Sequence, residues 1–520
     1  MGLSMRDRKN FYYAVRDEQS IAISSMLFIY VVLLLAGTLV IAARRPLWSD
    51  ELYTYYIATL PSFSSVWRAL LTGHEQIPLG FYAVERLSWG VFGINSVALR
   101  LPALLGCLVM SLALFKFVSR RLSPAYGLLA SVFPMTTSAF AYAREARPYG
   151  LELAFAALAL VCWQQATESN NRLLALIGLW LSFVAAISCH YYGILLILPL
   201  AFGELIRTIA RRRIDFGIWS CFVGSTLPLL LMLPLILSGA KLSGNFWAQP
   251  HWTDIASFYQ NLIAPGIPSL VAVVTVGVVA SRFRRPVPAT DSFNVDAAFP
   301  SHEQSAIIGF IALPLAGVLL AKLVTHAFTD RYVLAAVVGL SILFAQAMHK
   351  MLRGEFRVAA MVAPFLLAWF GFLEMQEVRS AEHVRQGLES STTLLQSANK
   401  EGLPIVAAEL HTFIELSHYS PQDIASHLIY LADPSMAQQF LGFGSLDSAM
   451  LELVGPWFHM RVVPFHQFLD AKVPFLLYGK VDLKSFSWVI RALQERGFRI
   501  EFHSSLGDKY LFAVTPPTDH

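Results

Sequence analysis

Long apolar runs separated by short polar stretches dominate the first 375 residues. A helix needs about 20 mostly apolar residues to cross a bilayer, and eleven runs approach that length. They predict helices near residues 21–43, 98–118, 124–142, 149–167, 173–189, 191–207, 216–238, 269–282, 305–323, 332–349 and 358–374. The pattern is typical of a polytopic α-helical membrane protein with about eleven transmembrane helices.

The pattern changes near residue 375 to that of an ordinary soluble protein. Residues 380–400 have the spacing of an amphipathic helix. Strand-like segments follow at LPIVAAE, HLIYLAD, VPFLLYG, FRIEFHS and KYLFAVT, with helical patterns between them. Alternating strands and helices favour a small α/β domain. We therefore expect two domains, a transmembrane domain at 1–375 with a long first outer loop at 44–97, and a soluble α/β domain at 376–520.

Composition agrees with this division. The 520 residues are 56% hydrophobic and only 14% charged, with a mean hydropathy of +0.54, whereas soluble proteins carry about 25% charged residues. The four cysteines all lie in apolar runs, so no disulfide framework or cysteine metal site is expected. The first apolar run, 21–43, could be a signal peptide, but its length favours a retained helix.

Basic residues predict the orientation. A cytoplasmic N-terminus puts eighteen lysines and arginines in inner segments and eight in the outer loops before residue 375. Inner loops of membrane proteins carry this excess. An odd number of spans then places the C-terminal domain outside. We expect no nucleic-acid partner for this protein.

Two adjacent acids follow the first predicted helix, in WSDELYTYY. Asp50 and Glu51 lie at the membrane boundary, where an ionisable side chain is a functional candidate. Like charge and partial desolvation can raise the pKa of one carboxyl and make it a useful base. The alternative is a solvated surface pair.

Arginines recur on the same outer side, against the inside bias. Arg144 and Arg147 flank Glu145 in YAREARPYG, and Arg331 lies in DRYVL. Guanidinium groups suit phosphate because they donate planar, bidentate hydrogen bonds. An internal salt bridge with Glu145 is an equally open interpretation, and the two are compatible.

Three histidines add weaker candidates. His190 lies between two predicted helices in SCHYYG, and is more simply an interfacial polar residue. His74 and Glu75 precede an apolar stretch and, with His251, could bind a divalent metal, although their spacing is not diagnostic. A transporter more often places its charges near the midplane. The acids and arginines on separate outer loops instead indicate a group-transfer site open to lipid and water.

Six segments carry a resemblance to a known family: WSDELYTYY, PLGFY, FGINSVALRLPALL, YAREARPYGLELA, HYYGILLILP and DRYVLAAVVGL. They resemble the bacterial branch of the protein O-mannosyltransferase-like family (glycosyltransferase family 39-like). That family includes the aminoarabinose transferase of lipid A and belongs to the polyprenyl-phosphate-dependent GT-C superfamily. The resemblance runs from about residue 20 to 345.

The resemblance implies an inverting glycosyltransferase in which Asp50 is the catalytic base. Glu51 is the second catalytic candidate, positioning sugar or acceptor. The resemblance further implies a donor phosphate held by Arg144, Arg147 and Arg331, and a donor and acceptor pocket formed by His74, Glu75, Tyr149, His190 and Tyr332. Many relatives carry an acid before paired prolines in the first loop. Here HEQIPLGFY has the single Pro78, with Glu75 as the nearest acid, which puts acceptor contacts and any metal in doubt.

The expected reaction moves a sugar from a polyprenyl phosphate to a hydroxyl of a lipid, glycan or protein. It would take place at the outer face of a bacterial inner membrane. A transporter or flippase of lipid-linked glycans and a lipid phosphate-group transferase are the alternatives.

Overall fold

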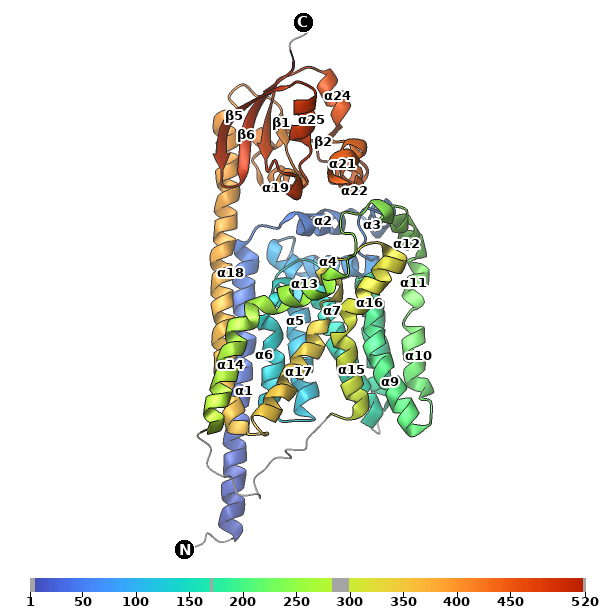
Figure 1. The fold of residues 1–520 in the computed structure, drawn as a ribbon, viewed down its shortest axis with the longest axis vertical. Helices are drawn as coiled ribbons and strands as arrows, with labels where there is room; N and C mark the ends of the chain where they lie inside the picture. The colour runs from blue at the N-terminus through green and yellow to red at the C-terminus, as the bar shows by residue number, and fades with distance from the viewer. Residues whose placement is uncertain (1–4, 169–171, 283–298, 518–520) are drawn as a thin grey trace.

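The computed structural model describes residues 5–168, 172–282 and 299–517, and it is mostly helical (Figure 1). The helices before the C-terminal sheet are α1 (Met5–Arg44), α2 (Ser49–Ala58), α3 (Phe63–Leu70), α4 (Leu79–Phe92), α5 (Ser96–Ser119), α6 (Pro124–Val132), α7 (Tyr149–Glu168), α8 (Arg172–Cys189), α9 (Ile197–Arg211), α10 (Phe216–Gly224), α11 (Leu227–Leu231), α12 (Leu233–Ala240), α13 (Thr253–Ile263), α14 (Ile267–Arg282), α15 (Ser301–Ile311), α16 (Leu313–Leu320), α17 (Ala336–Met351) and α18 (Phe356–Ala398). Short 3₁₀ or π segments join them: η1 (Phe133–Thr136), η2 (Ser138–Ala143), η3 (Tyr191–Leu196), η4 (Ser243–Asn245), η5 (Ala264–Gly266), η6 (Ala321–Thr325) and η7 (Asp330–Val333).

Helical segments occupy all eleven predicted positions, but the count of eleven spans is not confirmed. Within the described residues, six helices are long and apolar enough to cross a membrane: Ile21–Arg44, Ser96–Ser119, Arg172–Cys189, Tyr191–Arg211, Thr253–Val279 and Val358–Ala398. Two bent pairs of helices, broken near residues 232 and 312, bring the number to eight if each pair counts as one span. The other three predicted spans correspond to the short α6 with its 3₁₀ extension, to α7, and to the 16-residue α17.

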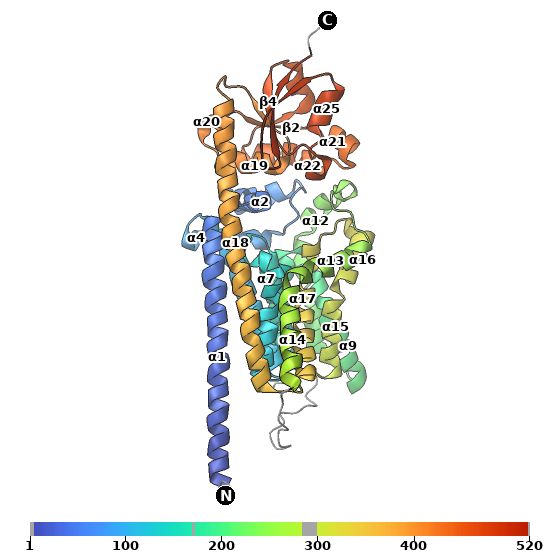
Figure 2. The same ribbon diagram turned by 60° about the vertical axis from the view of Figure 1, so that its left-hand side comes forward.

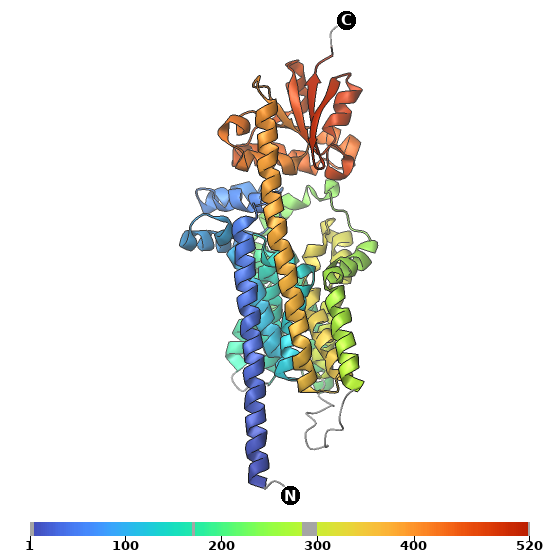
Figure 3. The same cartoon turned by 90° about the vertical axis from the view of Figure 1, so that its left-hand side faces the viewer.

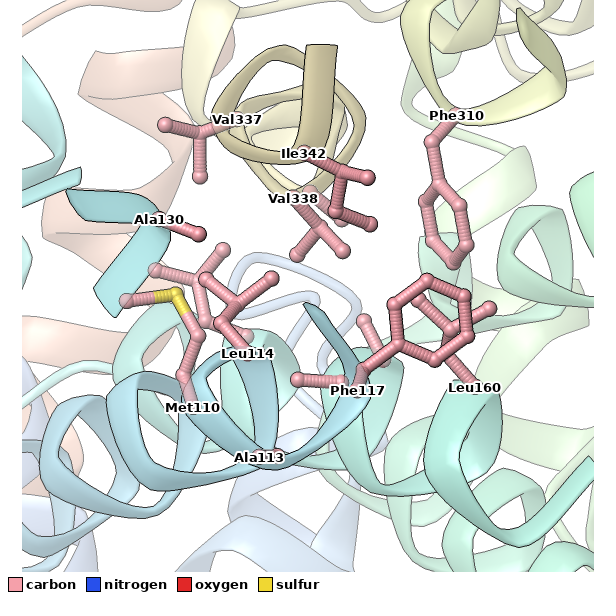
Figure 4. Close-up of a cluster of buried hydrophobic side chains, with 14 of the residues drawn as sticks. Met110, Ala113, Leu114, Phe117, Ala130, Leu160, Phe310, Val337, Val338 and Ile342 are labelled. Carbon is pink, nitrogen blue, oxygen red and sulfur yellow. The ribbon is translucent and has the colours of Figure 1, made fainter. Parts of the chain in front are cut away.

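The core of the bundle lies where α5, α6, α7, α15 and α17 meet. Figure 4 shows Met110, Leu114 and Phe117 of α5 facing Val338 and Ile342 of α17. Because lipid tails are as apolar as leucine, close packing rather than water exclusion holds such helices together.

Glycines bring α5 and α7 into close contact at one level of the bundle. A Cβ on Gly106 would overlap the Gly150 carbonyl oxygen, and one on Gly150 would overlap Ala103. This close approach fixes the start of α7, where Tyr149 lies, and with it the preceding turn that carries Arg147.

The first outer loop folds into short helices across one end of the bundle. α2, α3 and α4 lie between the bundle and the C-terminal domain (Figures 1 and 3). Segments 61–71 and 79–93 of this loop contain α3 and α4. α4 buries Phe81 and Tyr82 and exposes Leu87 and Val91, as an interfacial helix does. We call this end of the bundle its domain end.

The C-terminal domain contains a six-stranded sheet of order β3-β2-β1-β4-β6-β5. Its elements are β1 (Ile405–Ala407), α19 (Leu410–Tyr419), α20 (Gln422–Ala425), β2 (Leu428–Ala432), α21 (Pro434–Leu441), α22 (Ser445–Ala449), η8 (Met450–Val454), α23 (Gly455–Phe458), β3 (Val462–Pro464), α24 (Phe465–Asp470), β4 (Phe475–Gly479), η9 (Leu483–Ser485), α25 (Val489–Glu495), β5 (Arg499–Leu506) and β6 (Lys509–Thr515). The first four strands in this order are parallel, and the last two join antiparallel. All five predicted strands are present, and the short β3 was not predicted.

One long helix connects the two parts of the chain. The predicted span at 358–374 and the predicted amphipathic helix at 380–400 form the single α18, which runs from the bundle up beside the sheet (Figures 1 and 2). The division at 375 therefore falls inside a helix. The N-terminal end of α1 and the C-terminal domain lie at opposite ends of the molecule.

Candidate functional site

A cavity of about 610 Å³ opens between the domain end of the bundle and the C-terminal domain. Eight of the ten predicted site residues line it: Asp50, His74, Glu75, Arg147, Tyr149, His190, Arg331 and Tyr332. They come from α2, the loop before α4, the turn before α7, the first residue of α7, the segment between α8 and α9, and η7. Glu51 and Arg144 are not on the cavity wall.

The first turn of α2 separates the two adjacent acids. Successive residues of a helix point about 100° apart. The Trp48 backbone N–H donates to the Glu51 carboxylate at 3.3 Å, which fixes the start of the helix. Asp50 consequently faces the cavity, and Glu51 faces the interior.

Asp50 is held by arginines from distant segments. Arg331 donates through Nη1 to Asp50 Oδ2 at 2.7 Å, and both side chains are partly exposed, at 17% and 23%. Arg147 Nη1 donates to the Asp50 backbone carbonyl at 3.1 Å. Burial pushes the pKa of Asp50 upward, but the charges of Arg331 and Arg147 outweigh it and lower this pKa below its usual value. Asp50 is therefore ionised, as a proton acceptor must be.

Glu75 provides a second, more buried carboxyl on the same wall. Its Oε2 lies 3.7 Å from Arg147 Nη1, and its Oε1 accepts from the Ile77 backbone N–H at 3.1 Å. Burial raises the pKa of Glu75, and the negative charge of Asp50 adds to this rise, while Arg147 opposes it. The two cavity carboxyls therefore have pKa values displaced in opposite directions.

Aromatic rings form the wall behind Arg331. The guanidinium lies 5.6 Å from the ring centre of Tyr149, within the range of a cation–π contact. His190 contacts both Tyr149, at 5.3 Å, and Tyr332, at 5.1 Å. His190 Nδ1 also lies 3.4 Å from the buried carboxylate of Glu152. These contacts fix the rings around the arginine.

Glu51 instead forms a buried ion pair with Arg100 of α5. Arg100 donates through Nε and Nη2 at 2.7 and 2.6 Å, and both side chains are almost fully buried. Glu51 Oε1 also accepts from the Ala146 backbone N–H at 2.8 Å. Glu51 thus ties α2 to α5 and to the turn before α7, away from the cavity. Arg100 was not predicted, although an arginine in the apolar run FGINSVALRLPALL is itself a signal of a specific partner.

Arg144 is also directed away from the cavity. It pairs with Glu377 of α18 at 2.8 Å and lies 4.5 Å from the ring centre of Phe140. Burial lowers the pKa of Arg144 to about 10. Within the described part of the chain, neither Arg144 nor Arg147 forms an ion pair with Glu145. The two arginines pair with Glu377 and Glu75 instead.

The residues predicted for a metal do not converge. His74 contacts Glu452 of the C-terminal domain at 3.3 Å, while the backbone N–H of His251 donates to Asp254 at 2.7 Å. Across residues 5–168, 172–282 and 299–517, no group of three or more His, Cys, Asp or Glu side chains is placed to hold a metal ion.

The C-terminal domain completes the cavity with residues that sequence patterns did not indicate. They are Leu410, His411, Ser445, Leu446, Ala449 and Phe486. His411 lies at the start of α19 and hydrogen-bonds through Nδ1 to the hydroxyl of Ser49, next to Asp50. Only the docking of α19 on α2 brings this histidine to the site.

The fold and the apolar helices are those of an integral membrane protein, with an arginine–carboxylate cavity at one end of its helices. Residues 76–237, less than half of the chain, match the model of the family described as dolichyl-phosphate-mannose-protein mannosyltransferase. A comparison with curated proteins finds no significant match to the sequence.

Solved structures of ArnT from Cupriavidus metallidurans share the fold. The apo crystal structure superposes with a TM-score of 0.58 at 12% identity, covering 94% of this chain and 98% of that one. The crystal structure of the same protein bound to undecaprenyl phosphate gives 0.56, with the same identity and coverage. The predicted resemblance to GT-C glycosyltransferases of the mannosyltransferase and ArnT type is confirmed.

Proposed function

We propose that the protein is an inverting glycosyltransferase that moves a sugar from a polyprenyl phosphate to a hydroxyl acceptor. The observation that carries the proposal is the Arg331–Asp50 pair in the cavity, with Arg147 beside it. The Asp50 carboxylate can accept a proton, and the guanidinium groups of Arg147 and Arg331 can hold a phosphate. The ligand class follows that of ArnT, whose structure is solved with undecaprenyl phosphate.

Donor binding would change the partner of Arg331. A phosphate competes for the guanidinium because it accepts bidentate, charge-assisted hydrogen bonds. Release of Arg331 from the Asp50 carboxylate removes the interaction that keeps the pKa of Asp50 low. The donor would thereby make Asp50 a stronger base only when phosphate is in place.

In the proposed reaction the acceptor oxygen attacks the anomeric carbon from the face opposite the phosphate. Its proton passes to the Asp50 carboxylate as the new glycosidic bond forms. The bond between the anomeric carbon and the phosphate oxygen breaks, and polyprenyl phosphate leaves with the bonding electrons. Arg147 and Arg331 would stabilise the charge on that phosphate. Phosphate leaves readily, so the step needs no strong general acid.

Tyr149, His190 and Tyr332 are proposed to form the wall around the donor, and His74 and Glu75 lie on the side reached by the first loop. We assign Glu51 and Arg144 to the support of the site through their pairs with Arg100 and Glu377. The reaction would take place at the domain end of the bundle, at the outer face of a bacterial inner membrane.

Two measurements test this function. Mass spectrometry of envelope glycolipids and glycoproteins, in cells with and without the protein, should find a sugar-modified species that disappears without it. The purified full chain, incubated with a panel of undecaprenyl-phosphate sugars and a membrane extract, should then release undecaprenyl phosphate. If the chain in vesicles moves the intact sugar lipid across the bilayer without cleaving it, the protein is a transporter and the proposal is wrong.

A further inference from the structure

A second cavity, of about 710 Å³, lies beside the end of α1 and has no part in the proposed reaction. α1, the start of α5, α18 and α19 enclose it, and Figure 2 shows α1 and α18 running together there, with α4 alongside. Tyr55 of α2 lines this cavity, whereas Asp50 of the same helix lines the first one. One helix therefore separates the two cavities.

The lining of the second cavity is basic. Arg44 is the last residue of α1, Arg45 follows it and Arg385 comes from α18, while Glu389 is the one acid among the lining residues. Arg385 pairs with Glu382 at 2.7 Å. In the part of the chain that the structure describes, Arg44 and Arg45 form no ion pair. Two guanidinium groups are thus available to an anion.

The position along the helices places the cavity at the depth of lipid headgroups. Arg44 is the last residue of the apolar span Ile21–Arg44, and Ser96, which also lines the cavity, is the first residue of the span Ser96–Ser119. Both spans end at this level, where the hydrocarbon gives way to the interface. The N-terminus of the 24-residue α5 adds a partial positive charge beside the arginines.

An exposed apolar surface adjoins the basic cavity. Val91 and Phe92, at the end of α4, are 65% and 60% exposed, and Ile94, which lines the cavity, is 51% exposed. A soluble anion would not contact such an apolar surface, but the acyl chains of a lipid would cover it. Arginine next to exposed apolar side chains at the end of a span matches a molecule with a charged head and a hydrocarbon tail.

We propose that this cavity binds the phosphate-bearing headgroup of an anionic membrane lipid, with its acyl chains against Val91, Phe92 and Ile94. Arg44 and Arg45 donate to the phosphate oxygens, and α5 contributes the positive end of its dipole. The site is separate from the cavity of Asp50, and the proposal does not depend on the identity of the reaction.

Native mass spectrometry of the full chain tests the proposal. The purified protein is titrated with phosphatidylglycerol or with phosphatidylcholine, and the bound lipid is counted. Wild type should retain phosphatidylglycerol in preference to phosphatidylcholine. Arg44→Gln should weaken this retention about fivefold, the effect of one cation near an anionic surface, and Arg44→Gln with Arg45→Gln should weaken it further.

Arg68→Gln is the matched control. Arg68 is an exposed arginine of α3 at the same end of the bundle, and it does not line the cavity. Its loss removes the same charge, so it should leave lipid retention unchanged. Arg44 is itself exposed, so Arg44→Gln should fold normally even if the double variant does not.

Three outcomes would overturn the proposal. Equal retention of the two lipids would mean that the headgroup charge is not recognised. An equal loss in Arg68→Gln and Arg44→Gln would mean that only the general charge of this face matters. If inorganic phosphate displaces the lipid completely at similar concentration, the site takes a free phosphate and the apolar surface has no role.

Discussion

Glu51→Gln should destabilise the fold strongly, although the residue is adjacent to the proposed base. The substitution removes the carboxylate charge and leaves the buried Arg100 guanidinium with neutral acceptors only, which are the new amide oxygen and the carbonyls of Ala42, Arg45 and Pro46. Breaking a buried ion pair by neutralising one partner costs about 3–5 kcal/mol. Strain on the hydrogen bond from the Ala146 N–H would add to this cost. We therefore expect a loss of at least about 3 kcal/mol.

Asp50→Asn is the matched comparison, because it is the same chemical change one residue earlier. The Asp50–Arg331 pair is 17% and 23% exposed, whereas the Glu51–Arg100 pair is almost fully buried, and neutralising one partner costs less where water can still reach the other. Glu51→Gln should therefore unfold at a clearly lower temperature than Asp50→Asn. The double variant Glu51→Leu with Arg100→Met should recover much of the loss, because an apolar pair leaves no buried charge.

The four free cysteines provide the assay. Cys107, Cys189 and Cys221 are buried and Cys162 is half-buried, so a thiol-reactive dye reports unfolding of the purified chain on heating. The reasoning is refuted if Glu51→Gln unfolds at the wild-type temperature. If it also loses turnover while remaining stable, Glu51 acts in the reaction rather than in the support of the site.

Three further predictions follow from the site and the domain above it. Arg331→Gln removes a charge that lowers the pKa of Asp50 in the free enzyme, so the acid limb of its residual kcat/KM profile should move to higher pH, and an unmoved limb would contradict the assignment of Asp50 as base. Burial raises the pKa of Asp447 to about 7, so its stabilising contribution is full below about pH 4 and is lost as the pH rises towards 7. Thermal unfolding of the full chain between pH 5 and 8 should show this fall in wild type but not in Asp447→Asn. His411→Ala breaks the hydrogen bond to Ser49 and should lower turnover. His411→Asn keeps a polar group near the position of Nδ1 and should retain turnover. An equal loss of turnover in both variants would mean that the imidazole ring itself is needed.

Sequence patterns predicted most of the residues that line the cavity, because charged residues at unusual positions along the chain can be recognised without a structure. Arg147 and Arg331 oppose the topological bias, and acids at the end of a span are costly, so both pointed to the same face of the membrane. The structure brings Arg147, Arg331 and Asp50 together. The strands could be predicted equally well, because β1, β2 and β4 are continuous apolar runs.

The orientation of neighbouring residues could not be predicted in the same way. Asp50 and Glu51 differ only in which side of α2 they occupy, and the packing of α2 on Arg100 decides that. Arg144 looks equivalent to Arg147 in YAREARPYG, but its partner Glu377 lies on α18, far along the chain.

The number of spans was obscured by the shape of the helices. α10–α12 and α15–α16 bend, and α6 continues as 3₁₀ segments. A hydropathy pattern records apolar length but not such breaks. The position of His411 depends on how α19 docks on α2, which no local pattern encodes.

The most direct test of the central claim is turnover by Asp50→Asn beside Asp423→Asn, an exposed acid of α20 outside both cavities. Two quantities are measured for each variant: the rate at which undecaprenyl phosphate is released from the sugar donor, and the affinity for undecaprenyl phosphate itself. Loss of a general base costs about 10²–10⁴-fold in rate, so Asp50→Asn should lose turnover by that factor, bind the lipid phosphate normally and remain folded, while Asp423→Asn behaves as wild type. Turnover by Asp50→Asn at the wild-type rate would contradict the assignment of Asp50 as the base.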